Sequence, residues 1–274
     1  MLKKIITMLS VSSMSFAFSG CGDSGKKPER KIAVQTYTCH KMNLTDAFKL
    51  FNELGVKYTE IHGGKLGGDF PDVSLSSNMA PEHIEYLKSI CKKYDVTPIS
   101  YGVVYAKDEA EIRKAFEFAK TMGMKYISFE DDPAKFPIWD KLADEYGILP
   151  CVHNHAKHDN YQVWDYKWVA KHIAPYKNIG VCADNGAWTC SGLDGIEALR
   201  ALKGKIYTVH LKDQKDFGVS NSPVVIYGTG VVPVDKVLQE LDAQGYDGYL
   251  IIEHGNDGDK REIIAKDIEY IKSH

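Results

Sequence analysis

Short apolar runs alternate with amphipathic stretches along the chain from residue 31 to its end. The apolar runs are typical of strands, whereas the longer stretches repeat their apolar positions every three or four residues, which is typical of helices. The predicted strands are 31–36, 58–62, 97–103, 125–130, 149–154, 179–184, 206–211 and 249–254. The predicted helices are 45–54, 81–94, 108–122, 138–146, 164–173, 195–202, 234–244 and 260–271.

This alternation predicts a single domain over residues 31–274. Strands that alternate with helices form a parallel sheet, and eight such units close into a (β/α)8 TIM barrel, which is an α/β fold. An open doubly wound sheet is the alternative. It is disfavoured because no glycine-rich phosphate loop follows the first strand, as nucleotide or dinucleotide binding would require.

Four predicted strands in the second half of the chain end in groups that can bind a metal. The run ILPCVHNH contains His153, IGVCAD ends at Asp184, IYTVH ends at His210, and YLIIE ends at Glu253. The carboxyl ends of neighbouring parallel strands meet on one face of a barrel, so we expect these side chains to converge there. Two imidazoles and two carboxylates suit one divalent ion such as Mn, Co, Zn or Fe. The pattern predicts a metal-dependent enzyme.

Composition and charge leave this picture unchanged but exclude one class of partner. The chain has 274 residues, of which 44% are hydrophobic and 26% charged, and its formal net charge is −3. These values are typical of an ordinary globular domain and provide no large positive field. We therefore expect no nucleic-acid partner.

The amino-terminal residues 1–20 differ from the rest of the chain. Lys3 and Lys4 precede an apolar stretch that ends in small residues just before Cys21, which is the layout of a cleaved signal peptide. The sequence Phe-Ser-Gly-Cys ending at Cys21 resembles a bacterial lipoprotein signal, in which that cysteine carries the lipid. Residues 21–30 then form a polar tether. This reading predicts an exported, membrane-anchored lipoprotein, periplasmic or at the cell surface. An ordinary signal peptide with an incidental cysteine is the alternative.

Five further cysteines follow Cys21, an odd number whose spacing suggests no disulfide framework. We expect mostly buried free thiols, with Cys151 and Cys182 pointing into the barrel. Two long loops, 62–80 and 212–232, should leave the face that carries the metal ligands and could cover a substrate there.

Several short motifs from Lys31 onward resemble the xylose isomerase-like barrel superfamily, which includes sugar isomerases and epimerases. They are HNH at 153–155, CADNG at 182–186, HLKD at 210–213, GTG at 228–230, and GYDG followed by IIE up to 253. The resemblance implies one divalent ion held at four positions, which in this sequence are His153, Asp184, His210 and Glu253. It also implies a sugar substrate.

The chain departs from the epimerase pattern of that superfamily at two positions. His153 stands where the pattern has a glutamate, and Ala187 stands where it often has a histidine. An epimerase uses two glutamates as an acid and base pair on opposite faces of the substrate. With one of them replaced, Glu253 is the single strong base, which favours a one-sided reaction.

Other residues are candidates for supporting roles in catalysis or substrate binding. Lys212 lies two residues beyond His210, so its side chain should point to the same face and could stabilise negative charge on the substrate. His155 could donate a hydrogen bond to a hydroxyl group of the substrate or act as a further metal ligand. Glu130 could act as a second acid or base. Glu60 is either a substrate contact or a carboxylate bonded to a neighbouring cation or amide. Trp188 is the aromatic residue expected to form a wall of the sugar pocket.

The leading prediction is an isomerase or epimerase acting next to the carbonyl of an unphosphorylated sugar or keto-sugar. The first alternative is a lyase or hydratase acting on a 3-keto-glycoside at the same metal site. The second is a non-catalytic carbohydrate-binding lipoprotein, which His153 and Ala187 keep open. A three-metal endonuclease is disfavoured because these strand ends provide too few ligands and the surface lacks basic charge.

Overall fold

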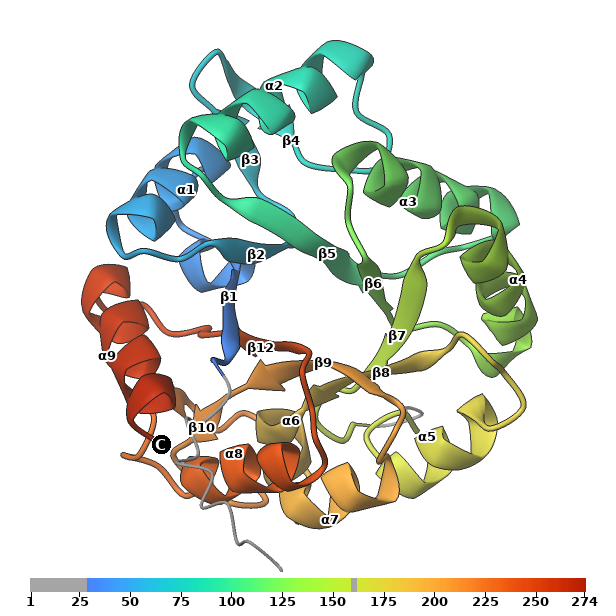
Figure 1. Ribbon diagram of the computed structural model, residues 1–274, viewed down its shortest axis with the longest axis vertical. Helices are drawn as coiled ribbons and strands as arrows, with labels where there is room; N and C mark the ends of the chain where they lie inside the picture. Colours follow the sequence, from blue (N-terminus) through green and yellow to red (C-terminus); the bar gives the residue numbers. More distant parts are fainter. Residues whose placement is uncertain (1–28, 159–161) are drawn as a thin grey trace, which may run out of the picture.

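The computed structural model describes residues 29–158 and 162–274. Eight parallel strands form a closed barrel in the order β1-β12-β9-β8-β7-β6-β5-β2, and β1 pairs with both β2 and β12 to complete the ring (Figure 1). The predicted TIM barrel is confirmed. The strands are β1 (Lys31–Gln35), β2 (Tyr58–Ile61), β5 (Thr97–Val104), β6 (Tyr126–Phe129), β7 (Leu149–His153), β8 (Gly180–Asp184), β9 (Ile206–Leu211) and β12 (Tyr249–Ile252).

The helices form a ring around the barrel (Figure 1). They are α1 (Leu44–Glu53), α2 (Pro81–Lys93), α3 (Glu109–Met122), α4 (Phe136–Tyr146), α5 (Tyr166–Ile173), α6 (Asn185–Cys190), α7 (Gly195–Ala201), α8 (Val234–Ala243) and α9 (Lys260–Ser273). The sequence predicted all of these except α6, a short helix that directly follows β8. None of the helices in the described part of the chain is long and apolar enough to span a membrane.

Each of the two long loops contains a small hairpin. The first hairpin consists of β3 (Lys65–Gly67) and β4 (Phe70–Ser74), and the second of β10 (Asp213–Gln214) and β11 (Val224–Val225). Asp213 organises the second loop, because its carboxylate accepts hydrogen bonds from the backbone amides of Gly228, Gly230 and Val232 at 2.8–3.0 Å.

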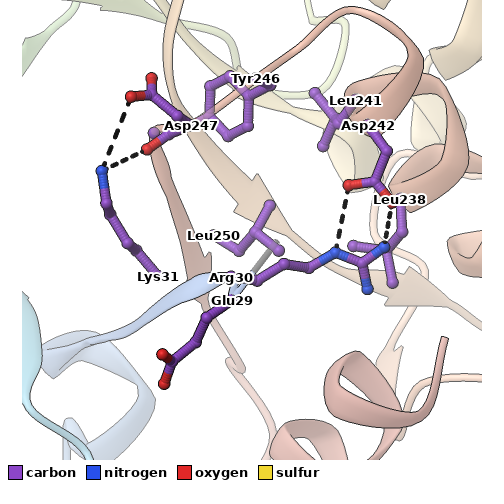
Figure 2. A pocket seen from close by; sticks show the side chains of 10 residues that line it. Glu29, Arg30, Lys31, Leu238, Leu241, Asp242, Tyr246, Asp247 and Leu250 are labelled. Atoms are coloured by element: carbon purple, nitrogen blue, oxygen red, sulfur yellow. Dashed lines mark hydrogen bonds and ion pairs between the residues drawn. The ribbon is translucent and has the colours of Figure 1, made fainter. Parts of the chain in front are cut away.

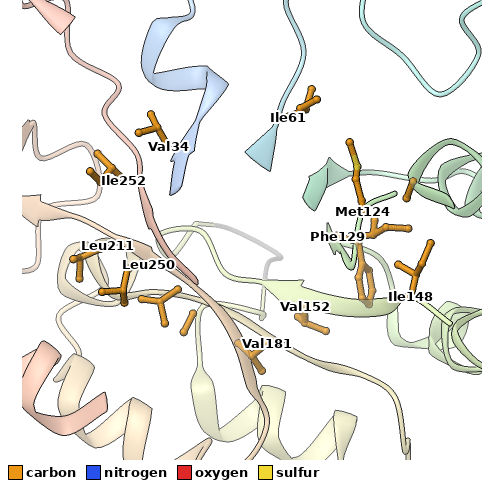
Figure 3. Packing of buried hydrophobic residues seen from close by; sticks show 14 of the residues in the cluster. Val34, Ile61, Met124, Phe129, Ile148, Val152, Val181, Leu211, Leu250 and Ile252 are labelled. Carbon is orange, nitrogen blue, oxygen red and sulfur yellow. The ribbon is translucent and has the colours of Figure 1, made fainter. Parts of the chain in front are cut away.

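The strand pleat divides the apolar residues into two layers. Side chains that point outward from the strands pack against the helices in one continuous core, part of which is drawn in Figure 3 with Val34, Val152, Val181 and Ile252. The opposite side chains fill the barrel interior, where Ala33, Ile99, Tyr126, Cys151, Cys182 and Ile251 form a smaller apolar cluster. Successive strand residues point to opposite faces, so the next inward positions toward the carboxyl ends lie directly above this cluster.

The five cysteines from Cys39 to Cys190 are buried free thiols, as the sequence predicted. Cys151 and Cys182 point into the barrel interior, which was also expected. The predicted signal peptide and Cys21 lie outside the described residues.

The described chain enters the barrel at its amino-terminal end, which is the face opposite the predicted metal ligands. There the Arg30 guanidinium donates to both oxygens of Asp242, at 2.6 and 3.4 Å, and to the carbonyl of Ile271 at 2.8 Å. Lys31 lies beside Asp247 (Figure 2). These contacts fix the start of β1 against α8 and α9.

Candidate metal centre

The strand pleat places a layer of polar residues at the carboxyl end of the barrel interior. On β7, Cys151 and His153 share the inward face, and on β8 the same holds for Cys182 and Asp184. The side chain of His210 on β9 also points into the barrel interior. Glu253 directly follows β12 and has the parity of inward-facing Ile251. An apolar floor therefore lies beneath a buried polar layer.

The structure brings together the four residues that the sequence proposed as metal ligands. One ligand atom from each of His153, Asp184, His210 and Glu253 lies within 4.8 Å of every other. His153 Nε2 is 3.0 Å from His210 Nδ1 and 3.6 Å from Asp184 Oδ2, and His210 Nδ1 is 2.7 Å from Glu253 Oε2. The oxygens Asp184 Oδ2 and Glu253 Oε2 are buried beside these nitrogens. This donor set fits a divalent ion.

On each of the two imidazoles, the ring nitrogen that faces away from the other ligands is bonded to a carboxylate. Glu130 Oε1 lies 3.0 Å from His153 Nδ1, which leaves Nε2 facing the other ligands. Glu60 Oε1 lies 2.7 Å from His210 Nε2, which leaves Nδ1 facing them. A carboxylate on the second ring nitrogen fixes the orientation of a metal-binding histidine and increases its basicity. Both rings are therefore oriented for coordination.

The protonation states of the two histidines are coupled. Burial opposes their charge, but hydrogen bonds to Asp184 and Glu130 raise the pKa of His153 to about 9. Burial likewise opposes the charge of His210, yet Cys182, Glu60 and Glu253 hold its pKa well above the ordinary value. The facing nitrogens are 3.0 Å apart, so a proton on one of them is donated to the other. A cation bound between them must displace the proton they share, so its affinity should rise with pH.

Lys212 supplies the positive charge next to the two carboxylate ligands. Its Nζ lies 2.8 Å from Asp184 Oδ2 and 3.0 Å from Glu253 Oε2. Burial would raise the pKa of both carboxyls, but the Lys212 charge helps to hold each below its ordinary value. Gly186 leaves room for this side chain, because a Cβ there would lie 2.6 Å from the Lys212 Cβ. Lys212 is therefore paired with Asp184 and Glu253 rather than with the adjacent Asp213.

Replacing Lys212 by methionine should strengthen metal binding. The ammonium group repels a divalent ion that would bind the same two carboxylates, so its loss should increase the affinity by roughly tenfold or more, measured by calorimetry with Mn²⁺ or Zn²⁺. The metal-free protein should lose about 3–5 kcal/mol of stability, because two buried carboxylates lose their counter-charge. Lys135→Met is the control, since Lys135 pairs with Asp131 outside the ligand set. Unchanged metal affinity in Lys212→Met would contradict this assignment.

The other predicted site residues occupy different surroundings. His155 lies two residues beyond β7, is half-exposed and bonds Glu130 rather than joining the four ligands. Glu130 thus contacts both histidines, which lower its pKa to about 2 although burial opposes this. Glu60 is fully buried and bonded to His210, which corresponds to the second of its two predicted roles. Trp188 is 1% exposed and packs edge-on against Tyr166, so it has no exposed face for a ligand in this conformation.

Sequence reasoning missed the residues that hold Glu60 in place and one possible ligand. Gln35 donates to Glu60 Oε1 at 2.7 Å and Ser128 to Oε2 at 3.2 Å. Strand parity was the available signal, because both residues are inward positions near strand ends. Cys182 lies close enough to His153 and His210 to form another potential metal-binding group, although the sequence favoured a packing role for it.

The comparisons with known proteins agree with the barrel fold. Residues 48–274 match the family described as xylose isomerase-like TIM barrel. A solved structure of an uncharacterised protein from Parabacteroides distasonis is 27% identical, with a TM-score of 0.73, covering 89% of this chain and 98% of that one. A 3-keto-D-glucoside 4-epimerase from E. coli is 13% identical, with a TM-score of 0.68 and coverage of 90% and 100%.

A third solved structure, the IOLI protein with a bound zinc atom, is 18% identical to this chain. Its TM-score is 0.66, and the match covers 89% of this chain and 94% of that one. A search of curated proteins found none that matches. The family match extends over most of the chain and includes all four candidate ligands, so this protein belongs to the xylose isomerase-like TIM barrel family.

Proposed function

We propose that this chain is a metal-dependent enzyme that moves a proton next to the carbonyl group of an unphosphorylated sugar or keto-sugar, as isomerases and epimerases do. The observation that carries the proposal is that ligand atoms of His153, Asp184, His210 and Glu253 lie within 4.8 Å of one another. The second ring nitrogen of each imidazole is bonded to a carboxylate, which fixes its orientation. Family membership and the 3-keto-D-glucoside epimerase among the similar structures support a sugar substrate.

The four ligands would hold a single divalent ion, either Mn, Co, Zn or Fe. When bound, the ion would act as a Lewis acid on a substrate carbonyl and an adjacent hydroxyl oxygen. Glu253 would take the proton from the carbon next to the carbonyl. Lys212, whose ammonium lies 3.0 Å from Glu253, would stabilise the negative charge that develops on the substrate oxygen. Glu60 and Glu130 would keep the two imidazoles in their coordinating orientation.

The test begins with metal analysis of the purified protein. The metal-loaded protein is then incubated in D2O with a panel of ketoses and keto-glucosides, and deuterium at the carbon next to the carbonyl is measured. We expect about one divalent ion per chain and metal-dependent exchange with at least one sugar. A protein whose melting temperature does not respond to metals, and which exchanges nothing, would instead support the carbohydrate-binding alternative.

A lyase or hydratase acting on 3-keto-glycosides remains the second candidate, and one observation favours it. Glu253 has no equivalent carboxylate across the ligand set, because His153 occupies that position, and Glu130 and Glu60 lie on the far side of the two imidazoles from the other ligands. A site with a single base on one side suits proton removal followed by loss of a substituent. Release of free aglycone from a 3-keto-glucoside would distinguish this reaction from epimerisation.

We also propose that a lipid on Cys21 anchors the protein at a membrane surface, after export. The first described residues lie at the amino-terminal face of the barrel, opposite the metal ligands, so a tether attached there would leave the catalytic face open. Cys21→Ser should abolish incorporation of labelled fatty acid and release the protein from the membrane fraction. Cys39→Ser, at a buried thiol, should retain both. An unlabelled wild-type protein in the soluble fraction would contradict the anchor.

A further inference from the structure

A large cleft opens beside the candidate metal centre. Its volume is about 860 Å³, and it is lined by residues that follow β5, β6 and β7 together with Trp168 of α5. Glu130 and His155 belong to its lining, and both also adjoin the metal centre, since Glu130 bonds His153. The cleft therefore begins at the edge of the metal centre and extends away from it.

The volume of the cleft is larger than a single sugar ring would occupy. Small-molecule pockets range over roughly 300–1,000 Å³, and this one lies near the upper end. A monosaccharide whose carbonyl reached the four ligands would leave most of this volume free. The substrate can therefore carry a second group beyond the reacting ring.

An aromatic side chain is available to hold such a group. Tyr105 follows β5, lines the cleft and is 60% exposed, an unusual exposure for a large ring in the described chain. Partial burial and the charge of nearby Glu130 raise the pKa of Tyr105, so the phenol stays neutral. An exposed flat face of this kind suits the C–H groups of a sugar or another aromatic ring.

The charges in the cleft argue against a phosphorylated group. Lys135 is paired with Asp131 at 3.2 Å, and Asp131 is also fixed by the Trp139 indole at 2.8 Å. The other lysine of the lining, Lys107, is paired with Glu111. The lining contains three carboxylates and two lysines, and so has no excess of positive charge for binding an anion.

We infer that this cleft is a binding subsite for the neutral second group of a glycoside, whose reacting sugar occupies the metal centre and whose other ring stacks on Tyr105. The inference rests on the proposed function for the placement of the reacting sugar. It makes the substrate a glycoside rather than a free monosaccharide.

The test compares two probes that differ only in the second group, methyl 3-keto-β-glucoside and 4-nitrophenyl 3-keto-β-glucoside. Their binding to metal-loaded protein is measured by calorimetry, which requires no turnover. Wild-type protein should bind the nitrophenyl compound about tenfold more tightly than the methyl compound. Tyr105→Ala should remove this difference without changing the affinity for the methyl compound.

Phe217→Ala is the matched control, because Phe217 is similarly exposed, at 59%, but lies outside this cleft. It should leave both affinities unchanged. Equal binding of the two probes, no binding of either, or a preference that survives Tyr105→Ala would overturn the subsite. Deuterium exchange with the same probes reports separately on the proposed function. Deuterium exchange without tighter binding of the nitrophenyl compound would contradict the subsite but not the proposed function. Tyr105-dependent binding without exchange would contradict the proposed enzymatic activity but not the subsite.

Discussion

Replacing Asp184 by asparagine should strongly weaken metal binding, so that metal concentrations that saturate the wild-type protein no longer saturate the variant. Asp184 Oδ2 is a fully buried oxygen directed at the other three ligands, and an amide at this position has no negative charge for a cation. We expect the affinity for Mn²⁺ or Zn²⁺ to fall by at least about 100-fold. At a metal concentration of 100 times Kd, the wild-type protein should gain about 2.7 kcal/mol, a rise in melting temperature of roughly 5–10 °C. The variant should gain at most about 0.4 kcal/mol under the same conditions.

Asparagine is chosen because Asp184 also has a structural role. Its Oδ1 accepts the Ala187 amide at 2.8 Å and so caps α6, and asparagine can make the same cap. Asp267→Asn is the matched control, since Asp267 is equally buried and bonded to a histidine, His254, but lies outside the metal centre. The control should melt at a lower temperature and still respond to metal. Metal binding by Asp184→Asn at wild-type affinity would refute the ligand set.

Hydrophobic periodicity was sufficient to predict the barrel and the convergence of the four candidate ligands. The strand runs are short and bounded by clear helical patterns, and closure of eight parallel strands brings their carboxyl ends together regardless of side-chain detail. Strand parity then decides which residues point inward. Cys182 and Asp184 share one face of β8, and His210 takes the same face of β9.

The contacts between side chains could not be predicted in the same way. Glu60 lies 150 positions before His210 in the chain, on a strand that is not its neighbour in the barrel, and their hydrogen bond crosses the interior. Parity predicts that both point inward, but rotamers and the exact stagger of the strands determine which carboxylate meets which imidazole. The contact of Lys212 with Asp184, rather than with the adjacent Asp213, depends on the same details.

The location of Trp188 illustrates a different limit. Helix α6 has six residues, too few to show a helical repeat, so the sequence placed Trp188 in an open loop after the strand. Helix α6 instead directs the Trp188 ring into the protein interior, where it packs against Tyr166. Among the described residues, Tyr105 presents an exposed aromatic face beside the metal centre.

The buried polar layer itself carries an energetic cost that only function explains. Glu60, Asp184, His153 and His210 are each at most 1% exposed, and removing such charged groups from water is unfavourable even when they are paired. Apolar residues of similar size would stabilise the barrel at least as well. The arrangement therefore argues for a site selected for chemistry rather than for folding.

Glu253→Gln should eliminate proton transfer even when the metal is fully bound. As the single strong base in the set, Glu253 would be responsible for removing the proton, and loss of a positioned base typically costs about 10²–10⁴-fold in rate. The measurement is deuterium exchange from D2O into a responsive keto-sugar, at a metal concentration raised until calorimetry shows full occupancy. Full occupancy separates the role of Glu253 as a base from its role as a ligand.

Glu240→Gln controls for the loss of a paired, partly buried carboxylate elsewhere, because Glu240 lies on α8 and pairs with Arg200. It should exchange at the wild-type rate. If metal-saturated Glu253→Gln also retained the wild-type rate, another group would have to be the base. Glu130 would then be the next to test, since it both adjoins the ligands and lines the cleft.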